Sequence, residues 1–288
     1  MGDSIKGKEI LYALLLCIDF NFKLKNQLVS SWSRDPGYDD GWAYFVPHKP
    51  YEEHVLAHTD DSDISSCVGF VALAQQNTRN SCGLRYTGIG AVVCGRSEMV
   101  LANGVGNLEK GERYANSDFI YTYALHHHLQ SFQQVFLMLK FMLLVIVAYN
   151  IACQWFVNLS QQMVSWKENL KSPDWVSIIH EKLDCSLCWG IGYADCKCVE
   201  RVWGGLNAAG FTTKSMSPRS RILMLNDHIG HHNWSKFLGL GTTILRYYTQ
   251  AIKDQNQQTE AHRGLSDSID GKLLGNWEKI SQDRCKSL

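Results

Sequence analysis

Two polar side chains stand where strongly apolar segments of the chain end. Asp19 closes the stretch Cys17-Ile18-Asp19, and Asn150 directly follows the apolar segment Leu143–Tyr149. A buried charge is costly unless it is paired, hydrogen-bonded or bound to a metal ion. If the two segments are neighbouring strands, Asn150 lies within reach of Asp19. The alternatives are a loop cap for Asp19 and an ordinary helix cap for Asn150.

A second carboxylate, Glu200, begins a predicted helix over Glu200–Leu206. Two strand-end groups and one helix carboxylate are the arrangement that holds two divalent metal ions roughly 4 Å apart for phosphoryl transfer. Carboxylate oxygens suit the hard Mg²⁺ ion. An exposed surface glutamate without a ligand is the other interpretation of Glu200.

Four cysteines lie close together, at Cys185, Cys188, Cys196 and Cys198. The first pair has the spacing of zinc ligands, whereas the second pair has only one intervening residue and follows after a short gap. A four-sulfur zinc site and a set of unligated thiols are therefore both open.

A second group of residues that could ligate a metal ion contains three histidines and one aspartate. These are Asp227, His228, His231 and His232. The spacing of His228 and His232 fits one face of a helix, but the sequence contains no HExxH motif. Gly230 disfavours a helix at this point. We therefore do not expect a metal site here.

The chain has no global basic field, because 28 Lys and Arg residues balance 28 Asp and Glu residues. Binding to nucleic acid would need a local patch. Lys214, Arg219 and Arg221 lie in a Ser- and Thr-rich segment that we predict to be a loop over residues 212–221. They would give sequence-independent contacts to phosphates. A solvated loop is equally compatible with this pattern.

The composition predicts a folded protein, since 45% of the 288 residues are hydrophobic and only 19% are charged. The ten cysteines are scattered through apolar segments, which favours a reducing compartment. No signal-peptide cleavage pattern follows the apolar N-terminal segment. The run Val135–Ala148 is too short for a membrane span and contains Lys140.

The hydrophobic pattern predicts strands alternating with helices, which is an α/β order. The predicted strands are Ile10–Phe22, Ala43–Val46, Gly88–Cys94 and Leu143–Tyr149, and the predicted helices are Tyr114–Phe132, Ile151–Trp166, Glu200–Leu206 and Ile244–Ile252. The segment Asn103–Gly111 is glycine-rich and polar and is not among the predicted strands. We expect a core over residues 1–252 and a polar, loosely attached tail over residues 253–288.

Several motifs occur in the order found in Kyakuja-Dileera-Zisupton (KDZ) transposases, and the chain resembles this family over Leu11–Ile252. The motifs are CIDFNFKLK, DPGYDDGWAYFV, GIGAVVCGRSE, NGVGNLEKGERY, YNIACQW, VERVW, NDHIGHHNWSK and GLGTTILR. The resemblance implies a ribonuclease-H-like mixed sheet flanked by helices, with a helical insertion. It also implies an Asp-Asp-Glu (DDE) metal triad, Mg²⁺ as cofactor, transposon-end DNA as partner and a nuclear or cytoplasmic location.

By this resemblance Asp19 is the first acid, Asn150 stands in the place of the second and Glu200 is the third. The family usually has Asp where this chain has Asn150, and a neutral amide supplies an acceptor oxygen but no charge. The segment before the third acid, Ile179–Val199, is shortened. The resemblance thus predicts an incomplete third catalytic segment and a degenerate DDE transposase that does not cleave DNA.

Two other functions remain open from the sequence. One is a DNA-binding remnant without catalysis that contacts phosphates through Lys214, Arg219 and Arg221. The other is a structural module stabilised by Zn²⁺ around Cys185–Cys198. The sequence does not indicate the oligomeric state.

Overall fold

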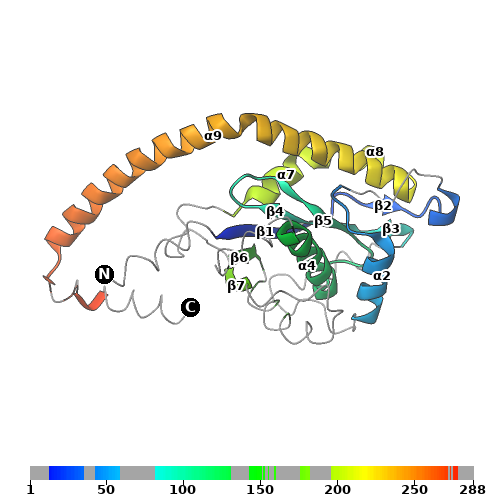
Figure 1. The fold of residues 1–288 in the computed structure, drawn as a ribbon, viewed down its shortest axis with the longest axis horizontal. Coiled ribbons are helices and arrows are strands. Elements are labelled where there is room, and N and C mark those ends of the chain that lie inside the picture. Colours follow the sequence, from blue (N-terminus) through cyan, green and yellow to red (C-terminus); the bar gives the residue numbers. More distant parts are fainter. Residues whose placement is uncertain are drawn as a thin grey trace. The chain divides into compact units, whose positions relative to one another are not determined.

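The computed structural model describes most of the chain, as two compact units over residues 1–236 and 237–288. The described residues are 13–35, 43–58, 82–130, 143–150, 152, 155, 159, 176–181, 196–271, 273 and 275–277. The first unit contains the sheet and the helices around it (Figure 1). It is a mixed α/β structure, as the alternation of apolar segments predicts.

The centre of the first unit is a five-stranded sheet with the strand order β5-β4-β1-β6-β7. Its strands are β1 (Leu14–Asn21), β4 (Gly88–Cys94), β5 (Val100–Leu108), β6 (Leu143–Tyr149) and β7 (Val176–Glu181). The strand β1 pairs antiparallel with β4 and parallel with β6, so it lies in the middle of the sheet. Two of the predicted strands, Gly88–Cys94 and Leu143–Tyr149, are confirmed with their predicted ends.

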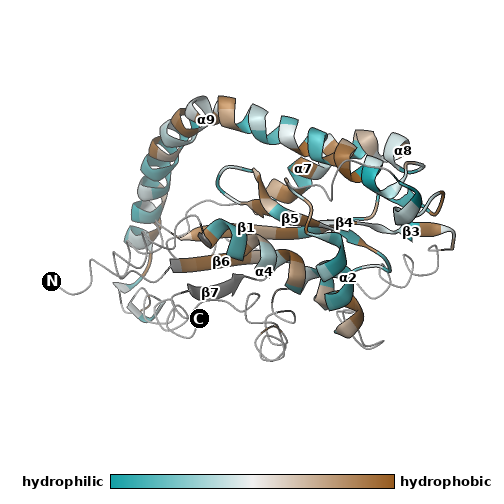
Figure 2. Ribbon diagram, turned by 45° about the vertical axis from the view of Figure 1, so that its right-hand side comes forward, coloured by the Kyte–Doolittle hydropathy of each residue, from teal (hydrophilic) through white to brown (hydrophobic). Residues whose placement is uncertain are grey.

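Helices cover both faces of this sheet because successive strand residues point to opposite sides. On β1, Leu16 and Ile18 pack in the cluster that includes α4 (Tyr114–Gln130). Leu15 and Cys17 pack in the cluster that includes α7 (Cys198–Leu206). Figure 2 shows apolar residues along the strands of the sheet. The predicted helices at 114–132 and 200–206 are thus confirmed, with α7 starting two residues earlier.

The glycine-rich segment Asn103–Gly111, which we did not predict to be a strand, mostly belongs to strand β5. Its glycines make room for α4: a Cβ added at Gly106 would lie 2.6 Å from Cδ1 of Ile120 on that helix. A glycine inside a strand often marks such a close approach. The pattern of turn-forming residues therefore reflects packing against a helix.

The strand predicted over Ala43–Val46 is also wrong. Only a single bridge forms there, between Phe45 and Val105 of β5. Pro47 follows at once, and proline has no N–H group to continue a ladder. The chain instead enters α2 (His48–Ala57).

The loop predicted over residues 212–221 is largely helical. It contains the end of α8 (Gly210–Thr213) and the start of α9 (Pro218–Ser268). Proline is well suited to the first position of a helix, because its missing N–H would have no partner there. α9 also includes the predicted helix Ile244–Ile252.

Gly230 does not interrupt α9, contrary to our expectation. A glycine inside a helix costs about 1 kcal/mol, which packing can offset. Ile222, Leu225 and Ile229 of α9 are buried in the cluster on the α7 face of the sheet. This burial stabilises the helix around Gly230.

The second unit begins at Phe237 and contains the rest of α9. Residue 252, where we predict the core to end, lies inside this helix, and the division into core and tail stays a prediction. None of the helices within the described ranges combines the length and apolar character that a membrane crossing requires. In the predicted helix Ile151–Trp166, the described residues Ala152, Trp155 and Leu159 are helical, and the others lie outside the described part.

Candidate functional site

Asp19 lies near the carboxyl end of the central strand, on the face of the sheet that α7 covers. The indole Nε1 of Trp203 on α7 donates a hydrogen bond to Oδ2 of Asp19 at 2.9 Å. Burial raises the pKa of the Asp19 carboxyl, against the lowering effect of hydrogen bonds from the Phe20 backbone and Trp203, and the charge of Glu200 raises it further. Asp19 is therefore a partly buried carboxylate that is hydrogen-bonded to a helix distant in sequence.

Glu200 lies in the first turn of α7, three residues before Trp203, so both side chains lie on adjacent parts of one helix surface. The helix is oriented by its apolar side, because Val199, Val202 and Leu206 are buried against the sheet. Glu200 itself is exposed. Glu200 therefore stands at the start of the helix whose Trp203 contacts Asp19, and its charge raises the pKa of the Asp19 carboxyl.

Asn150 is an exposed turn residue directly after β6. In the parallel pair of β1 and β6, Tyr149 is aligned with Ile18. Asn150 therefore follows Tyr149 as Asp19 follows Ile18, and both polar residues lie at the same end of two neighbouring strands. The condition that our sequence argument set for their proximity, adjacent strands, is met.

The position of α7 is held by an ionic contact at the turn between β4 and β5. Glu98 in this turn lies 2.6 Å from Arg201, the residue after Glu200, and also pairs with Lys236 on α9. Although burial opposes ionisation, these two cations keep the pKa of Glu98 below its ordinary value. Glu98 thus links both helices to the sheet.

Glu112, just before α4, is an acid of this region that we did not predict. The Tyr149 hydroxyl donates a hydrogen bond to Oε1 of Glu112 and lies 3.1 Å from Oγ of Ser117. Burial raises the pKa of Glu112 to about 7, and the charge of Asp19 also raises it, while the bond from Tyr149 acts in the opposite direction. Glu112 is therefore in electrostatic range of Asp19.

Two residues of this region that we did not predict, Glu112 and Trp203, lie in motifs quoted in the sequence analysis. Glu112 lies in the motif NGVGNLEKGERY, between a strand and a helix, and Trp203 ends the motif VERVW. A tryptophan one turn after an acid on an amphipathic helix is a usual core residue. Its hydrogen bond to Asp19 depends on a strand that lies 184 positions away in the sequence.

Among the described residues, no group of three or more His, Cys, Asp or Glu side chains is arranged to hold a metal ion. Cys198 is a free thiol, fully buried in the apolar cluster of α7. Cys196 is disulfide-bonded, so its sulfur is not a thiolate, which is the form that zinc binds. Cys185 and Cys188 lie outside the described residues, so the zinc module stays a prediction.

The histidine group does not converge on one point of α9. Asp227, His228 and His231 are exposed. Nε2 of His232 lies 2.9 Å from the backbone oxygen of Glu98, in the turn that also contacts Lys236. His232 thus takes part in the packing of α9 against the turn at Glu98, and the expectation of no metal site stays a prediction.

The three basic residues predicted to contact phosphates have different environments. Lys214 is exposed, and the Arg219 guanidinium lies 5.9 Å from the ring centre of Trp32. Arg221 is fully buried, donates to Oδ1 of Asn107 and donates to the backbone oxygen of Leu24 at 2.7 Å. Its burial lowers the pKa to about 10. Arg221 is therefore a core residue and was wrongly predicted to reach DNA.

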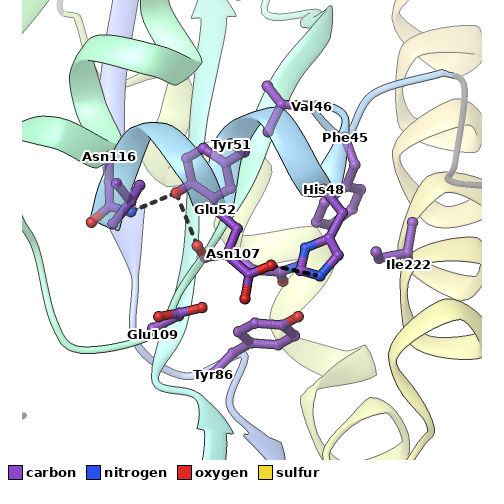
Figure 3. Close-up of a pocket in the computed structure, with 11 residues that line it drawn as sticks. Phe45, Val46, His48, Tyr51, Glu52, Tyr86, Asn107, Glu109, Asn116 and Ile222 are labelled. Carbon is purple, nitrogen blue, oxygen red and sulfur yellow. Dashed lines mark hydrogen bonds and ion pairs between the residues drawn. The ribbon is translucent and has the colours of Figure 1, made fainter. Parts of the chain in front are cut away.

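One small pocket lies between α2 and the sheet (Figure 3). The Tyr51 hydroxyl donates to the Asn107 backbone oxygen at 2.9 Å and accepts from Nδ2 of Asn116, while His48 pairs with Glu52 at 3.6 Å. The cavity has a volume of about 20 Å³, which is room for about one water molecule. It is too small for a substrate, and Asp19, Asn150 and Glu200 are not among its lining residues.

Comparison with known protein families matches residues 12–233 to the Kyakuja-Dileera-Zisupton (KDZ) transposase family. The match covers most of the chain, and the chain belongs to this family. The resemblance drawn from the motifs is thereby confirmed. Comparisons with curated proteins and with solved structures find no match.

Proposed function

We propose that this chain is a degenerate KDZ-type DDE transposase core that has lost DNA strand cleavage. The observation that supports this most is the hydrogen bond that joins Asp19 on the central strand to Trp203, one helical turn after Glu200 on α7. Asn150, in the place of the second acid, follows the strand that pairs with β1. The substitution leaves two carboxylates where the family has three.

The architecture supports a ribonuclease-H-like core for this proposal. The sheet is mixed, helices pack on both faces, and the first acid lies on the central strand. This is the arrangement that the resemblance predicts. The shortened segment before Glu200 falls largely on residues outside the described part, so the incomplete third segment remains part of the proposal.

The oxygen atoms of Asp19, Asn150 and Glu200 fit Mg²⁺, because this ion prefers hard oxygen ligands. A bound pair of such ions would activate a water molecule or a DNA 3′-hydroxyl and stabilise the leaving oxygen. In this chain the indole N–H of Trp203 donates a hydrogen bond to Oδ2 of Asp19 and so restrains the carboxylate on the face of the sheet that α7 covers. Asn150 offers one carbonyl oxygen without charge, so cation binding is weaker than with an acid.

A strand-cleavage assay tests this function. Transposon-end DNA would be incubated with the full chain and Mg²⁺ or Mn²⁺, with Asp19→Ala as the matched control. We expect both proteins to leave the DNA intact. We also expect Asn150→Asp alone not to restore cleavage, because the catalytic segment before α7 would still be incomplete.

Two outcomes would contradict the proposal. Robust cleavage by the wild-type chain that disappears in Asp19→Ala would show an active enzyme. Restoration of cleavage by Asn150→Asp alone would show that the third segment is intact.

A non-catalytic DNA-binding remnant is the second candidate, with DNA as partner and a nuclear or cytoplasmic location by resemblance. Lys214 is exposed and Arg219 lies at the surface edge beside Trp32, which supports contacts to phosphates. Binding that weakens with salt and proceeds without cleavage would favour this function.

A further inference from the structure

Two segments of this neutral chain contain basic residues and no acid. Residues 20–34 contain Lys23, Lys25 and Arg34, and neither Asp nor Glu. Residues 201–226 contain no acid and four basic residues, of which Arg201 pairs with Glu98 and Arg221 is buried, which leaves Lys214 and Arg219. In a chain with equal numbers of acidic and basic residues, these segments are local exceptions that would attract a polyanion.

The fold joins these two segments through Asn26. Its Nδ2 donates to the backbone oxygens of Thr213 at 3.3 Å, Lys214 at 3.2 Å and Met216 at 2.9 Å. The backbone N–H of Gln27 donates to Lys214 at 2.7 Å. Figure 1 shows β2 (Asn26–Gln27) close to α8. The two segments therefore pack against each other, and Asp35, which follows the first, accepts a hydrogen bond from the backbone N–H of Arg219.

A second set of contacts fixes these segments close to the end of β1. Nδ2 of Asn21, the last residue of β1, donates to Oδ1 of Asn207 at 2.9 Å. A Cβ added at Gly210 would lie 3.2 Å from the backbone oxygen of Lys23, so the two backbones are in close contact. Thr213 is fully buried and donates to the Ala209 backbone oxygen. The backbone on both sides of Phe211 is thus held in place.

Phe211 projects from this fixed backbone into solvent with 90% of its surface exposed. It is the most exposed large apolar side chain of the described residues. Single exposed apolar residues are common and need no explanation by themselves. Here Phe211 lies one turn before the exposed Lys214 and directly after Gly210, whose backbone contacts that of the exposed Lys23.

Aromatic rings beside basic residues are how proteins bind single-stranded nucleic acid, since bases stack on the ring and cations contact the backbone. α7 and the short helical segments after it lead from Glu200 to Phe211 within the first unit. Phe211 therefore lies on the same structural unit as the candidate acids.

We propose that Phe211 stacks on an unpaired base of a DNA strand whose phosphates contact Lys23 and Lys214. We call this the stacking surface. The assignment rests on the proposed function, because that function supplies DNA as the polyanion. It replaces buried Arg221 with a residue that the sequence did not point to.

The test is fluorescence anisotropy with the full chain, using a labelled single strand and a labelled blunt duplex of the same sequence. Phe211→Ala should weaken single-strand binding roughly tenfold, the effect of losing one stacked base, and leave duplex binding unchanged. Phe211→Trp should retain tight single-strand binding. Lys214→Gln should weaken both and reduce the salt slope by about 0.7 to 0.9.

Leu56→Ala is the matched control, because Leu56 is 71% exposed and lies on α2. It should bind both DNAs as the wild type does. If the wild type binds DNA and Phe211→Ala binds the single strand equally well, the stacking surface is wrong and the proposed function stands. If the wild type binds neither DNA, the stacking surface is wrong and the function as a DNA-binding remnant is overturned as well.

Discussion

At the scale of single residues, the acids around Asp19 differ in how far the sequence reveals them. Asp19 and Glu200 stand out because a charge next to an apolar segment needs a reason. Glu112 has no such signal, since a polar residue between a strand and a helix is ordinary. Its link to the site runs through the Tyr149 hydroxyl, which only the fold brings to it.

The prediction for Arg221 was wrong in the opposite sense, because the sequence indicated a surface residue and the structure has a buried one. Its neighbours Arg219 and Ser220 suggest a solvated basic segment, yet its guanidinium is enclosed by Asn107 and Leu24 from other parts of the chain. It also lies 5.6 Å from the ring centre of Tyr86. A sequence pattern does not distinguish a surface cation from a buried one when the enclosing groups are distant in sequence.

Glu112→Gln should change how the free energy of unfolding depends on pH. Burial raises the folded-state pKa of Glu112 from 4.5 to about 7, so between these values the unfolded chain releases a proton that the folded chain keeps. Wild-type stability should therefore fall relative to the variant as pH rises through this window, by up to about 3 kcal/mol. Urea denaturation of both proteins at a series of pH values measures the difference.

The amide of the variant can still accept the hydrogen bond from Tyr149, so the comparison isolates the titration of Glu112. Below the unfolded-state value the difference between the two proteins should be constant with pH. Parallel stability profiles across the whole window would mean that Glu112 is not held in a buried, protonated state.

At the scale of elements, the apolar segments predict the sheet well. Strands β4 and β6 end where the pattern places them, and β1, α4 and α7 lie within a few residues of their predicted bounds. Two elements that the pattern missed, β5 and the start of α9, carry residues with local turn or loop character. Gly104 and Gly106 lie in β5 because α4 packs there, and Pro218 begins a helix.

Alanine substitution at two glycines tests this packing account. A Cβ at Gly88 of β4 would lie 2.4 Å from the backbone oxygen of Asn21, whereas a Cβ at Gly204 of α7 would meet nothing within 4 Å. Gly88→Ala should therefore lower the free energy of unfolding by about 1 to 3 kcal/mol. Gly204→Ala should raise it by up to about 1 kcal/mol, because alanine favours the helix.

The measurement is chemical denaturation of both variants and the wild type under one set of conditions. The same substitution thus acts in opposite directions at the two sites. Equal effects of the two substitutions would contradict the tight contact between β4 and the end of β1.

At the scale of the whole molecule, the sheet, α4, α7 and the start of α9 belong to one unit that also contains every candidate site residue within the described ranges. The match to the KDZ family extends to residue 233, close to the end of this unit. The sequence predicted the family and the strand ends that bear Asp19 and Asn150. It did not predict the stacking surface, because Asn26 and Lys214 come together only in the folded chain.

The central claim is that Asp19, Asn150 and Glu200 belong to one cation site that the neutral amide has weakened. Mn²⁺ binding, measured by calorimetric titration of wild type, Asn150→Asp and the double variant Asn150→Asp with Asp19→Ala, tests it most directly. We expect Asn150→Asp to bind Mn²⁺ more tightly than the wild type, and the double variant to lose this gain. Equal Mn²⁺ affinity of wild type and Asn150→Asp, or a gain that persists without Asp19, would contradict the shared site.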